Sequence, residues 1–392
     1  MNMLIFPAIV LPFSREMGLA PSNVFPLGFM MYFLYGAFAL PAGYFADHWS
    51  NVGILRICML GMGFSSILAG FSTGVGDFTV SLALLGLFCG LYHPAGLGLI
   101  AHEIEEQGAA HGTNGIFGNF GLASAPFIAG LTLMIADWRF VFFVTGSCAI
   151  AGFLLTFIFT FKERDRAVPQ DNNNRDEKEN RVLPYFILLC VIMTIAGLTY
   201  RANMTAMPPY FEQNANSILQ LIGAVAGNEN SANAISGSAA LLVSSIFLFS
   251  MAGQYVGGHV ADRFDLRVAY IIAFLGGIPF VASMAFFSGW GLYIASAGYA
   301  FFSLGLQPVE NSLVSKFVPK KWLSTAYGIK FTLTFGLGSV AVWQVAILDK
   351  TWGLGWLYIA LAFQTLLMTI LAYLLLASSK GRFPWLGNKS EL

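Results

Sequence analysis

Three ionisable side chains fall within long apolar segments of this 392-residue chain: Arg201, Glu310 and Lys330. A charged group at the centre of a bilayer costs roughly 2.5 to 3.5 kcal/mol on insertion scales, so such residues are candidates for function. The guanidinium of Arg201 can donate two parallel hydrogen bonds to a carboxylate or a phosphonate, which predicts an anionic substrate. The alternative is that Arg201 extends to the membrane interface, where water solvates its charge.

Glu310 and Lys330 are expected at similar depths on consecutive helices, because each lies about 10 Å along its helix from a polar boundary at 1.5 Å per residue. Two interpretations follow. The two residues form a structural ion pair, or Glu310 couples transport to protons or contacts the substrate. Gln307 and Asn311 are four residues apart on a face that includes Glu310, so they can line the same path.

Two further polar candidates lie in apolar segments of the first half of the chain. His93 is followed by a proline in "GLYHPAG", and Asn119 belongs to "GNFGLASAPFIAG". A histidine can titrate near neutral pH and transfer a proton. The alternative is a neutral His93 that packs beside a kink at Pro94. Asn119 can contribute a polar group to the same path.

The composition explains why these polar residues are conspicuous. Hydrophobic residues make up 57% of the chain and charged residues 10%, against about 25% charged in soluble domains. An apolar stretch of about 18 or more residues predicts a membrane-spanning helix. We count eleven such stretches and one shorter stub, which together predict twelve spans. They are 1–14 (the stub), 24–46, 54–73, 78–101, 114–136, 138–161, 183–207, 239–261, 268–288, 289–315, 323–347 and 353–378.

Several classes of function are not supported by the sequence. The formal net charge is zero, which gives no indication of nucleic acid binding. The four cysteines all lie in apolar stretches, so no disulfide framework is implied. No phosphate-binding loop, dinucleotide fingerprint or catalytic triad signature is found. We therefore expect no enzyme activity, no cofactor and no metal site. We expect a monomer whose partners are a small-molecule substrate, protons and the lipid bilayer.

Positive charge is distributed unevenly between the two sides of the predicted bundle. One side contains Arg56, the basic residues of "KERDRAVPQDNNNRDEKENR" at 162–181, Arg263, Arg267, Lys316, Lys320, Lys321, Lys380, Arg382 and Lys389. Loops rich in Lys and Arg remain in the cytoplasm. This predicts an integral protein of the plasma (inner) membrane, with the C-terminus and the central linker on the cytoplasmic side. On the opposite side, the polar stretch 208–238 is expected to include a short surface helix near 217–227.

An internal repeat divides the chain. Gly258 and Asp262 follow Gly43 and Asp47 by 215 positions, which predicts two six-helix halves. We expect an N-terminal half at 1–161, a linker at 162–182 and a C-terminal half at 183–392. The segment "VLPF" at 10–13 is similar to "MPPYF" at 207–211. When the two halves are aligned on these segments, the position equivalent to the start of the seventh span falls before Met1. The fold class is therefore an all-α membrane protein, twelve transmembrane helices in two pseudo-symmetric six-helix bundles, with the first helix expected to be truncated.

These features resemble the major facilitator superfamily, whose members contain two six-helix halves and a G-x-x-x-D loop after the second and eighth spans. The resemblance implies that these loops close the inward gate, through small residues that allow close approach and acidic residues that pair with the facing half. The candidate gating residues are Gly43, Asp47, Arg56, Gly258, Asp262 and Arg263.

Within that superfamily, the segments around His93 and Asn119 resemble the fosmidomycin-resistance type and the proton-coupled exporters. Ala95 stands where that type often has an acid. The resemblance implies efflux of a small organic solute by proton antiport with alternating access, and Arg201 predicts that this solute is anionic. Two alternatives remain: proton-coupled uptake of such a solute, and a sensor or assembly scaffold that has lost transport, which would account for Ala95, the truncated first helix and a first loop with only one arginine.

Overall fold

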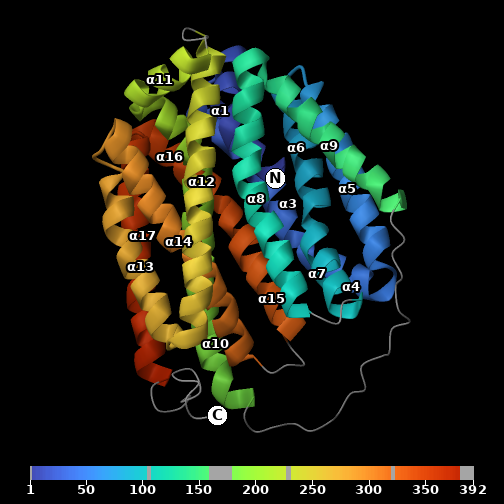
Figure 1. Cartoon of the computed structure of the whole chain (residues 1–392), viewed down its shortest axis with the longest axis vertical. Helices are drawn as coiled ribbons and strands as arrows, with labels where there is room; N and C mark the ends of the chain where they lie inside the picture. The colour runs from blue at the N-terminus through green and yellow to red at the C-terminus, as the bar shows by residue number, and fades with distance from the viewer. Residues whose placement is uncertain (1, 104–106, 159–178, 227–230, 319–322, 380–392) are drawn as a thin grey trace.

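The computed structural model describes residues 2–103, 107–158, 179–226, 231–318 and 323–379, and these residues form helices joined by short turns (Figure 1). The longer helices are α1 (Ile5–Met17), α5 (Asn51–Gly70), α6 (Val75–Gly90), α7 (Tyr92–Glu103), α8 (Gln107–Ile135), α9 (Trp138–Ile158), α10 (Glu179–Asn214), α11 (Asn216–Ala226), α12 (Ala232–Arg263), α13 (Leu266–Ser283), α14 (Gly289–Phe317), α16 (Ala341–Thr351) and α17 (Leu354–Ser379). The shorter ones are η1 (Asn2–Leu4), α2 (Pro21–Val24), η2 (Phe25–Gly28), α3 (Phe29–Ala37), α4 (Ala39–His48), α15 (Leu323–Phe331), η4 (Thr332–Gly336) and η5 (Leu337–Val340).

Ten of the described helical segments are long and apolar enough to cross a bilayer. α1, of 13 residues, and α14, of 29 residues, occupy the places of the first and tenth predicted spans. The all-α fold with two six-helix bundles is therefore confirmed, and α11 confirms the predicted surface helix. The boundaries between the halves remain predictions, because the linker at 162–182 lies largely outside the described residues.

The predicted polar stretch 208–238 is only partly a loop. α10 continues to Asn214 through Pro208 and Pro209, and α12 already begins at Ala232. The hydroxyl of Ser231 accepts a hydrogen bond from the backbone nitrogen of Ala234 at 3.2 Å and so caps α12. The sequence did not reveal these extensions, because the residues involved are polar or helix-breaking while tertiary contacts keep them helical.

Three of the crossings are interrupted, where the sequence suggested continuous spans. The second crossing consists of α2, η2, α3 and α4, and the fourth of α6 and α7, which meet beside Leu91. The eleventh contains a π-helical turn, η4, between α15 and η5. Single π turns inside α-helices occur frequently at functional sites. Here the turn lies where the eleventh crossing meets α3 and α10.

Glycines allow helices of the two bundles to approach closely at two points of contact. A Cβ on Gly36 of α3 would overlap the backbone of Gly336, and one on Gly130 of α8 would lie 2.7 Å from the carbonyl oxygen of Gly237 in α12. Small residues that bring helix backbones together are typical of membrane interfaces. α8 and α12 consequently run side by side along the long axis of the molecule (Figure 1).

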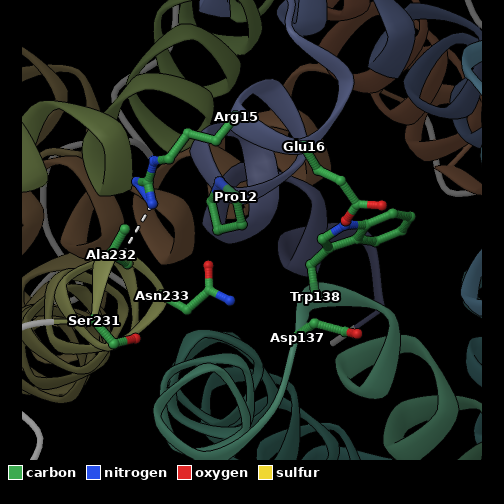
Figure 2. A pocket seen from close by; sticks show the side chains of 8 residues that line it. All are labelled: Pro12, Arg15, Glu16, Asp137, Trp138, Ser231, Ala232 and Asn233. Carbon is green, nitrogen blue, oxygen red and sulfur yellow. Dashed lines mark hydrogen bonds between the residues drawn. The ribbon is translucent and has the colours of Figure 1, made fainter.

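The end of the molecule that contains α11, called here the α11 end, is tied across the bundles by Arg15 of α1. Its guanidinium donates hydrogen bonds to the carbonyl oxygen of Ala232 and to the hydroxyl of Ser236, both at 2.9 Å, and it forms an ion pair with Glu212 of α10. A pocket of about 380 Å³ opens beside these contacts, and Figure 2 shows Arg15 reaching across it towards Ala232.

The other wall of this pocket belongs to the first bundle. In Figure 2 the carboxylate of Glu16 lies beside the indole of Trp138, which donates a hydrogen bond to it at 2.7 Å. Arg139 donates a second hydrogen bond to Glu16 at 2.8 Å. These contacts join α1 to α9 within one bundle, whereas those of Arg15 join the two bundles.

Candidate functional site

A cavity of about 940 Å³, called here the central cavity, lies between the two bundles. All seven residues predicted for the substrate and proton pathway line it: His93, Asn119, Arg201, Gln307, Glu310, Asn311 and Lys330. They come from both bundles, on α7, α8, α10, α14 and α15. Ligand pockets typically occupy about 300 to 1,000 Å³, with mostly apolar walls and a few polar groups, so the central cavity can accommodate a small organic molecule.

Glu310 and Lys330 form an ion pair in the wall of the cavity. The Lys330 Nζ lies 2.7 Å from Oε1 of Glu310, and each residue is 7% exposed. The hydroxyl of Tyr270 donates a hydrogen bond to Oε2 of Glu310 at 2.8 Å, and Lys330 donates another to Oδ1 of Asn311 at 2.5 Å. Both carboxylate oxygens therefore have partners, as a buried charge requires. The predicted pairing is confirmed, whereas a proton-coupling role stays a prediction.

Arg201 is buried, with 3% of its surface exposed, so the alternative in which it extends to the membrane interface is not observed. Its guanidinium carbon lies 3.8 Å from the ring centroid of Tyr32 and 6.0 Å from that of Phe335. Its Nε has no hydrogen-bond partner in the part of the chain that the structure describes. Among the described residues, no carboxylate lies within ion-pair distance of this guanidinium. Aromatic rings thus support the positive charge without neutralising it.

Aromatic side chains form one side of the central cavity. This surface, called here the aromatic wall, consists of Tyr35, His93, Phe331 and Phe335. The rings of His93 and Phe331 stack with centroids 5.2 Å apart, and those of Phe331 and Phe335 stack at 5.8 Å. Tyr35 lies 5.0 Å from Phe335. His93 is therefore packed among rings of both bundles and faces the cavity, so the structure leaves both interpretations of this residue open.

A chain of amides crosses from one bundle to the other. The side-chain nitrogen of Asn119 donates a hydrogen bond to Gln254, and Gln254 donates one to Gln307 at 3.1 Å. Gln254 was not predicted, since a single glutamine in α12 cannot be distinguished from a surface residue by sequence. This chain joins α8 to α14 through α12.

The exposure of the lining residues indicates which end of the central cavity is open. Asn2 and Leu4 of η1, at the start of α1, are buried, with 6% and 8% of their surface exposed. Gln307 and Asn311, towards the end opposite the α11 end, are exposed. Together with the contacts of Arg15 between the bundles, this shows a cavity closed at the α11 end and accessible from the opposite end.

The described gating candidates, Gly43, Arg56, Gly258, Asp262 and Arg263, lie outside the lining of the central cavity. Arg56 donates hydrogen bonds to Thr156 Oγ1 at 3.1 Å and to the Thr156 carbonyl at 3.0 Å, and so joins α5 to α9 within one bundle. A Cβ on Gly43 would lie 3.7 Å from Pro94, whereas one on Gly258 would meet nothing within 4 Å. Between the described residues, therefore, the expected close approach at Gly258 is not observed in this conformation.

The acidic residues of the two loops are described unequally. The side chain of Asp47 lies outside the described residues, although its backbone belongs to α4. Asp262 and Arg263 are exposed in the last turn of α12. Their gating role stays a prediction.

Some residues of the site were missed by sequence reasoning. Tyr32, Tyr35, Phe331 and Phe335 surround Arg201 or line the cavity. Their spacing, three residues in the first pair and four in the second, places each pair on one helix face. That signal was not selective, because the chain contains 37 phenylalanines and 14 tyrosines.

Comparison with known sequences gives one family. The sequence profile of the Major Facilitator Superfamily matches residues 1–227. The chain is 32% identical over 174 residues to the multidrug resistance protein MdtG of Rahnella sp. (strain Y9602), covering 43% of this chain and 41% of that protein. It is 26% identical over 268 residues to MdtG of Escherichia coli O9:H4 (strain HS), covering 66% of this chain and 61% of that protein. Both alignments span less than two thirds of the relative's length.

Solved structures share the fold at low sequence identity. A crystal structure of a D-xylose–proton symporter superposes with a TM-score of 0.74 at 16% identity, covering 95% of this chain and 93% of that one. A bacterial homologue of the human lysosomal transporter Spinster, inward-facing and unoccupied, gives a TM-score of 0.73 at 13% identity, with the same coverage. With the family profile matching more than half of the chain, this protein belongs to the Major Facilitator Superfamily of membrane transporters.

Proposed function

We propose that this transporter exports a small organic anion in exchange for protons by alternating access. The observation that supports this most is the buried guanidinium of Arg201 in the wall of the central cavity, which has no carboxylate partner among the residues that the structure describes. A buried cation without a counter-charge costs free energy, and an anionic substrate would supply that counter-charge. The same cavity contains Glu310, a carboxylate that can bind a proton.

Two observations support the direction of export. The relatives that align with this chain are named multidrug resistance proteins. In addition, an inside-negative membrane potential favours the outward movement of an anion by about 2.3 kcal/mol per charge per 100 mV. Export of an organic anion thus proceeds with the potential, and a proton that enters in exchange adds to the driving force.

We assign the conformation of the described residues to the inward-facing state of this cycle. By the positive-inside rule the α11 end lies outside the cell, so the accessible end of the central cavity faces the cytoplasm. A solute would enter between α7, α14 and α15, pass the Glu310–Lys330 pair and reach Arg201. We assign the halves to residues 1–161 and 183–392 with a cytoplasmic linker at 162–182, and a monomer in the inner membrane.

The ion pair also supports a second candidate, uptake by proton symport. Protonation of Glu310 would remove the counter-charge of Lys330 and make the cavity more positive, which favours binding of an anion together with a proton. Antiport instead requires a different coupling. After the solute has left, the empty transporter must change from the outward-facing to the inward-facing state only when Glu310 is protonated. The two candidates differ in the gradient that drives accumulation.

The experiment uses proteoliposomes and 2-naphthalenesulfonate, which stays anionic and does not cross membranes as a neutral acid. Antiport predicts accumulation when the lumen is acidic, and symport predicts it when the external medium is acidic. Accumulation independent of either gradient, or equal to that in protein-free liposomes, would contradict proton-coupled transport and favour the sensor or scaffold alternative.

A further inference from the structure

We propose that the central cavity selects organic anions with an aromatic ring system, whose anionic group binds Arg201 and whose ring packs against the aromatic wall. This inference rests on the proposed function and specifies its substrate class. It depends on the position of the Arg201 guanidinium next to the row of stacked rings. Neither the charge of Arg201 nor the size of the cavity would by itself predict a preference for aromatic solutes.

The anion subsite is defined by donors that lack partners. Within the described part of the chain, seven buried side-chain atoms have no hydrogen-bond partner, and two of them, Arg201 Nε and Thr334 Oγ1, belong to residues that line the central cavity. Buried polar groups in folded proteins nearly always have partners, and an oxygen of a ligand in the cavity would supply one to these donors on α10 and η4. Arg201 provides the charge and Thr334 a hydroxyl that can donate to a carboxylate or sulfonate oxygen.

The ring subsite begins next to this anion subsite. The Arg201 guanidinium carbon lies 6.0 Å from the Phe335 ring, and Phe331 continues the row one helical turn away. The interplanar angles along the row are 10° between Phe331 and Phe335 and 11° between His93 and Phe331. These nearly parallel rings leave a planar group several positions at which it can stack or pack edge to face.

The aromatic wall favours an aromatic ring over a saturated ring. Aromatic pairs are worth about 0.5 to 1.5 kcal/mol beyond the area that they bury, which a saturated ring of the same size does not gain. Lys330 of the ion pair precedes Phe331 in sequence, and the pair and Phe331 line the same cavity. A rigid molecule with one anionic group would therefore place its charge at Arg201 and its ring over Phe335 and Phe331.

The test is a binding measurement on the purified full chain in detergent, by isothermal titration calorimetry at one pH. The probes are 2-naphthalenesulfonate, its saturated analogue decahydronaphthalene-2-sulfonate and the neutral 2-naphthalenesulfonamide. We expect the saturated probe to bind about two- to twelvefold more weakly and the neutral probe about ten- to hundredfold more weakly. Equal binding of the saturated and aromatic sulfonates would overturn the proposal.

Variants separate the two subsites. Phe335→Leu and Phe331→Leu should weaken the aromatic sulfonate about two- to twelvefold and change the saturated probe less than about twofold, because only the stacking contribution is lost. Arg201→Gln should weaken both sulfonates and remove the preference over the sulfonamide. Phe143→Leu is the matched control, since its ring contacts Phe71 and Phe140 away from the cavity and its loss should change no affinity.

The outcomes distinguish this inference from the proposed function. Equal weakening of both sulfonates in Phe335→Leu, or tight binding in Arg201→Gln, would overturn the inference while leaving gradient-driven transport of other anions possible. Selective binding of the aromatic sulfonate without gradient-driven flux in proteoliposomes would support the inference and contradict the proposed transport. Thermal unfolding of each variant verifies that the folded protein is being compared.

Discussion

The ammonium nitrogen of Lys330 lies 2.7 Å from the carboxylate of Glu310, with both residues nearly buried in the wall of the cavity between the two bundles. This pair joins α14 to α15 at the end where the cavity is accessible. Breaking a buried ion pair by removing one partner typically costs about 3 to 5 kcal/mol, because the other charge is left without compensation. The pair therefore contributes to packing and provides a group whose protonation would change the charge of the cavity.

Replacing Glu310 with Gln should abolish proton-driven accumulation while preserving exchange. Glutamine can still accept a hydrogen bond from Lys330 but cannot bind or release a proton. The measurement compares accumulation under a pH gradient with counterflow at equal pH, and we expect at least about a tenfold loss in the first only. Undiminished gradient-driven accumulation would remove Glu310 from the coupling mechanism. Glu310→Gln and Lys330→Met each leave one buried charge without its counter-charge, so both should lower the unfolding temperature.

Arg201→Gln should abolish transport of an anionic solute and leave insertion into the membrane intact. Hydrogen bonds to charged groups are worth about 1.5 to 3 kcal/mol, so the apparent affinity should fall about ten- to hundredfold. Arg201→Lys keeps the charge but loses the planar fork, so we expect partial activity. Transport at the wild-type rate in Arg201→Gln would exclude this residue from the binding site.

Arg15→Gln should loosen the closure at the α11 end, because it removes the ion pair to Glu212 and the hydrogen bonds to Ser236 and Ala232. For a partly exposed pair we expect about 1 kcal/mol, or about a fivefold shift towards the state open at that end. Spin labels at Asp137 and Asn233, which lie on different sides of the pocket in Figure 2, report the opening by pulsed electron paramagnetic resonance.

Arg139→Gln provides the control for that experiment. Arg139 also forms an ion pair at the α11 end, at 2.7 Å to Glu16, but both residues belong to the first bundle. Its loss should leave the distance between the two labels unchanged. A shift in Arg139→Gln equal to that in Arg15→Gln would show that the effect is not specific to the contact between the bundles.

Gly36→Ala should destabilise the protein, because the added methyl group overlaps the backbone of Gly336 in the facing bundle. Overpacking a tight contact costs about 1 to 3 kcal/mol. Gly76→Ala in α6 is the matched control, since a Cβ there would meet nothing within 4 Å and alanine favours the helix. Thermal unfolding in detergent should show a lower midpoint for Gly36→Ala only. Equal midpoints for the two variants would argue against close packing between Gly36 and Gly336.

Asp262→Asn should slow the transport cycle more than it weakens binding of the solute. Asp262 lies in the last turn of α12, outside the lining of the central cavity, so a change there should act on closure of the cytoplasmic end. The test compares the turnover rate in proteoliposomes with the dissociation constant in detergent. An unchanged turnover rate would count against the gating role.

The fold and the location of the cavity could be predicted from the sequence because the bilayer makes polar residues costly. Arg201, Glu310 and Lys330 stood out against apolar segments, and all three line the central cavity. The repeat of the loop at Gly43 and Gly258 indicated two halves, and the fold contains two six-helix bundles. The signal was strong because neither feature depends on the details of packing.

The aromatic wall and the contacts at the α11 end could not be predicted in the same way. Phe331 and Phe335 are two of many aromatic residues in apolar spans, and only the tertiary fold places them beside Arg201. Arg15 and Glu212 lie near the ends of helices, where charged residues are common, and their pairing depends on the approach of α1 to α10. The π-helical turn at Thr332–Gly336 likewise follows from packing against the facing bundle rather than from local sequence.

The most direct test of the central claim measures proton movement and solute movement in the same proteoliposomes. A pH-sensitive dye in the lumen reports protons while fluorescence of 2-naphthalenesulfonate reports the solute. The account predicts that external addition of the sulfonate raises the pH of the lumen, and that Glu310→Gln and Arg201→Gln both abolish this change. A sulfonate flux that leaves the pH of the lumen constant in the wild-type protein would contradict it.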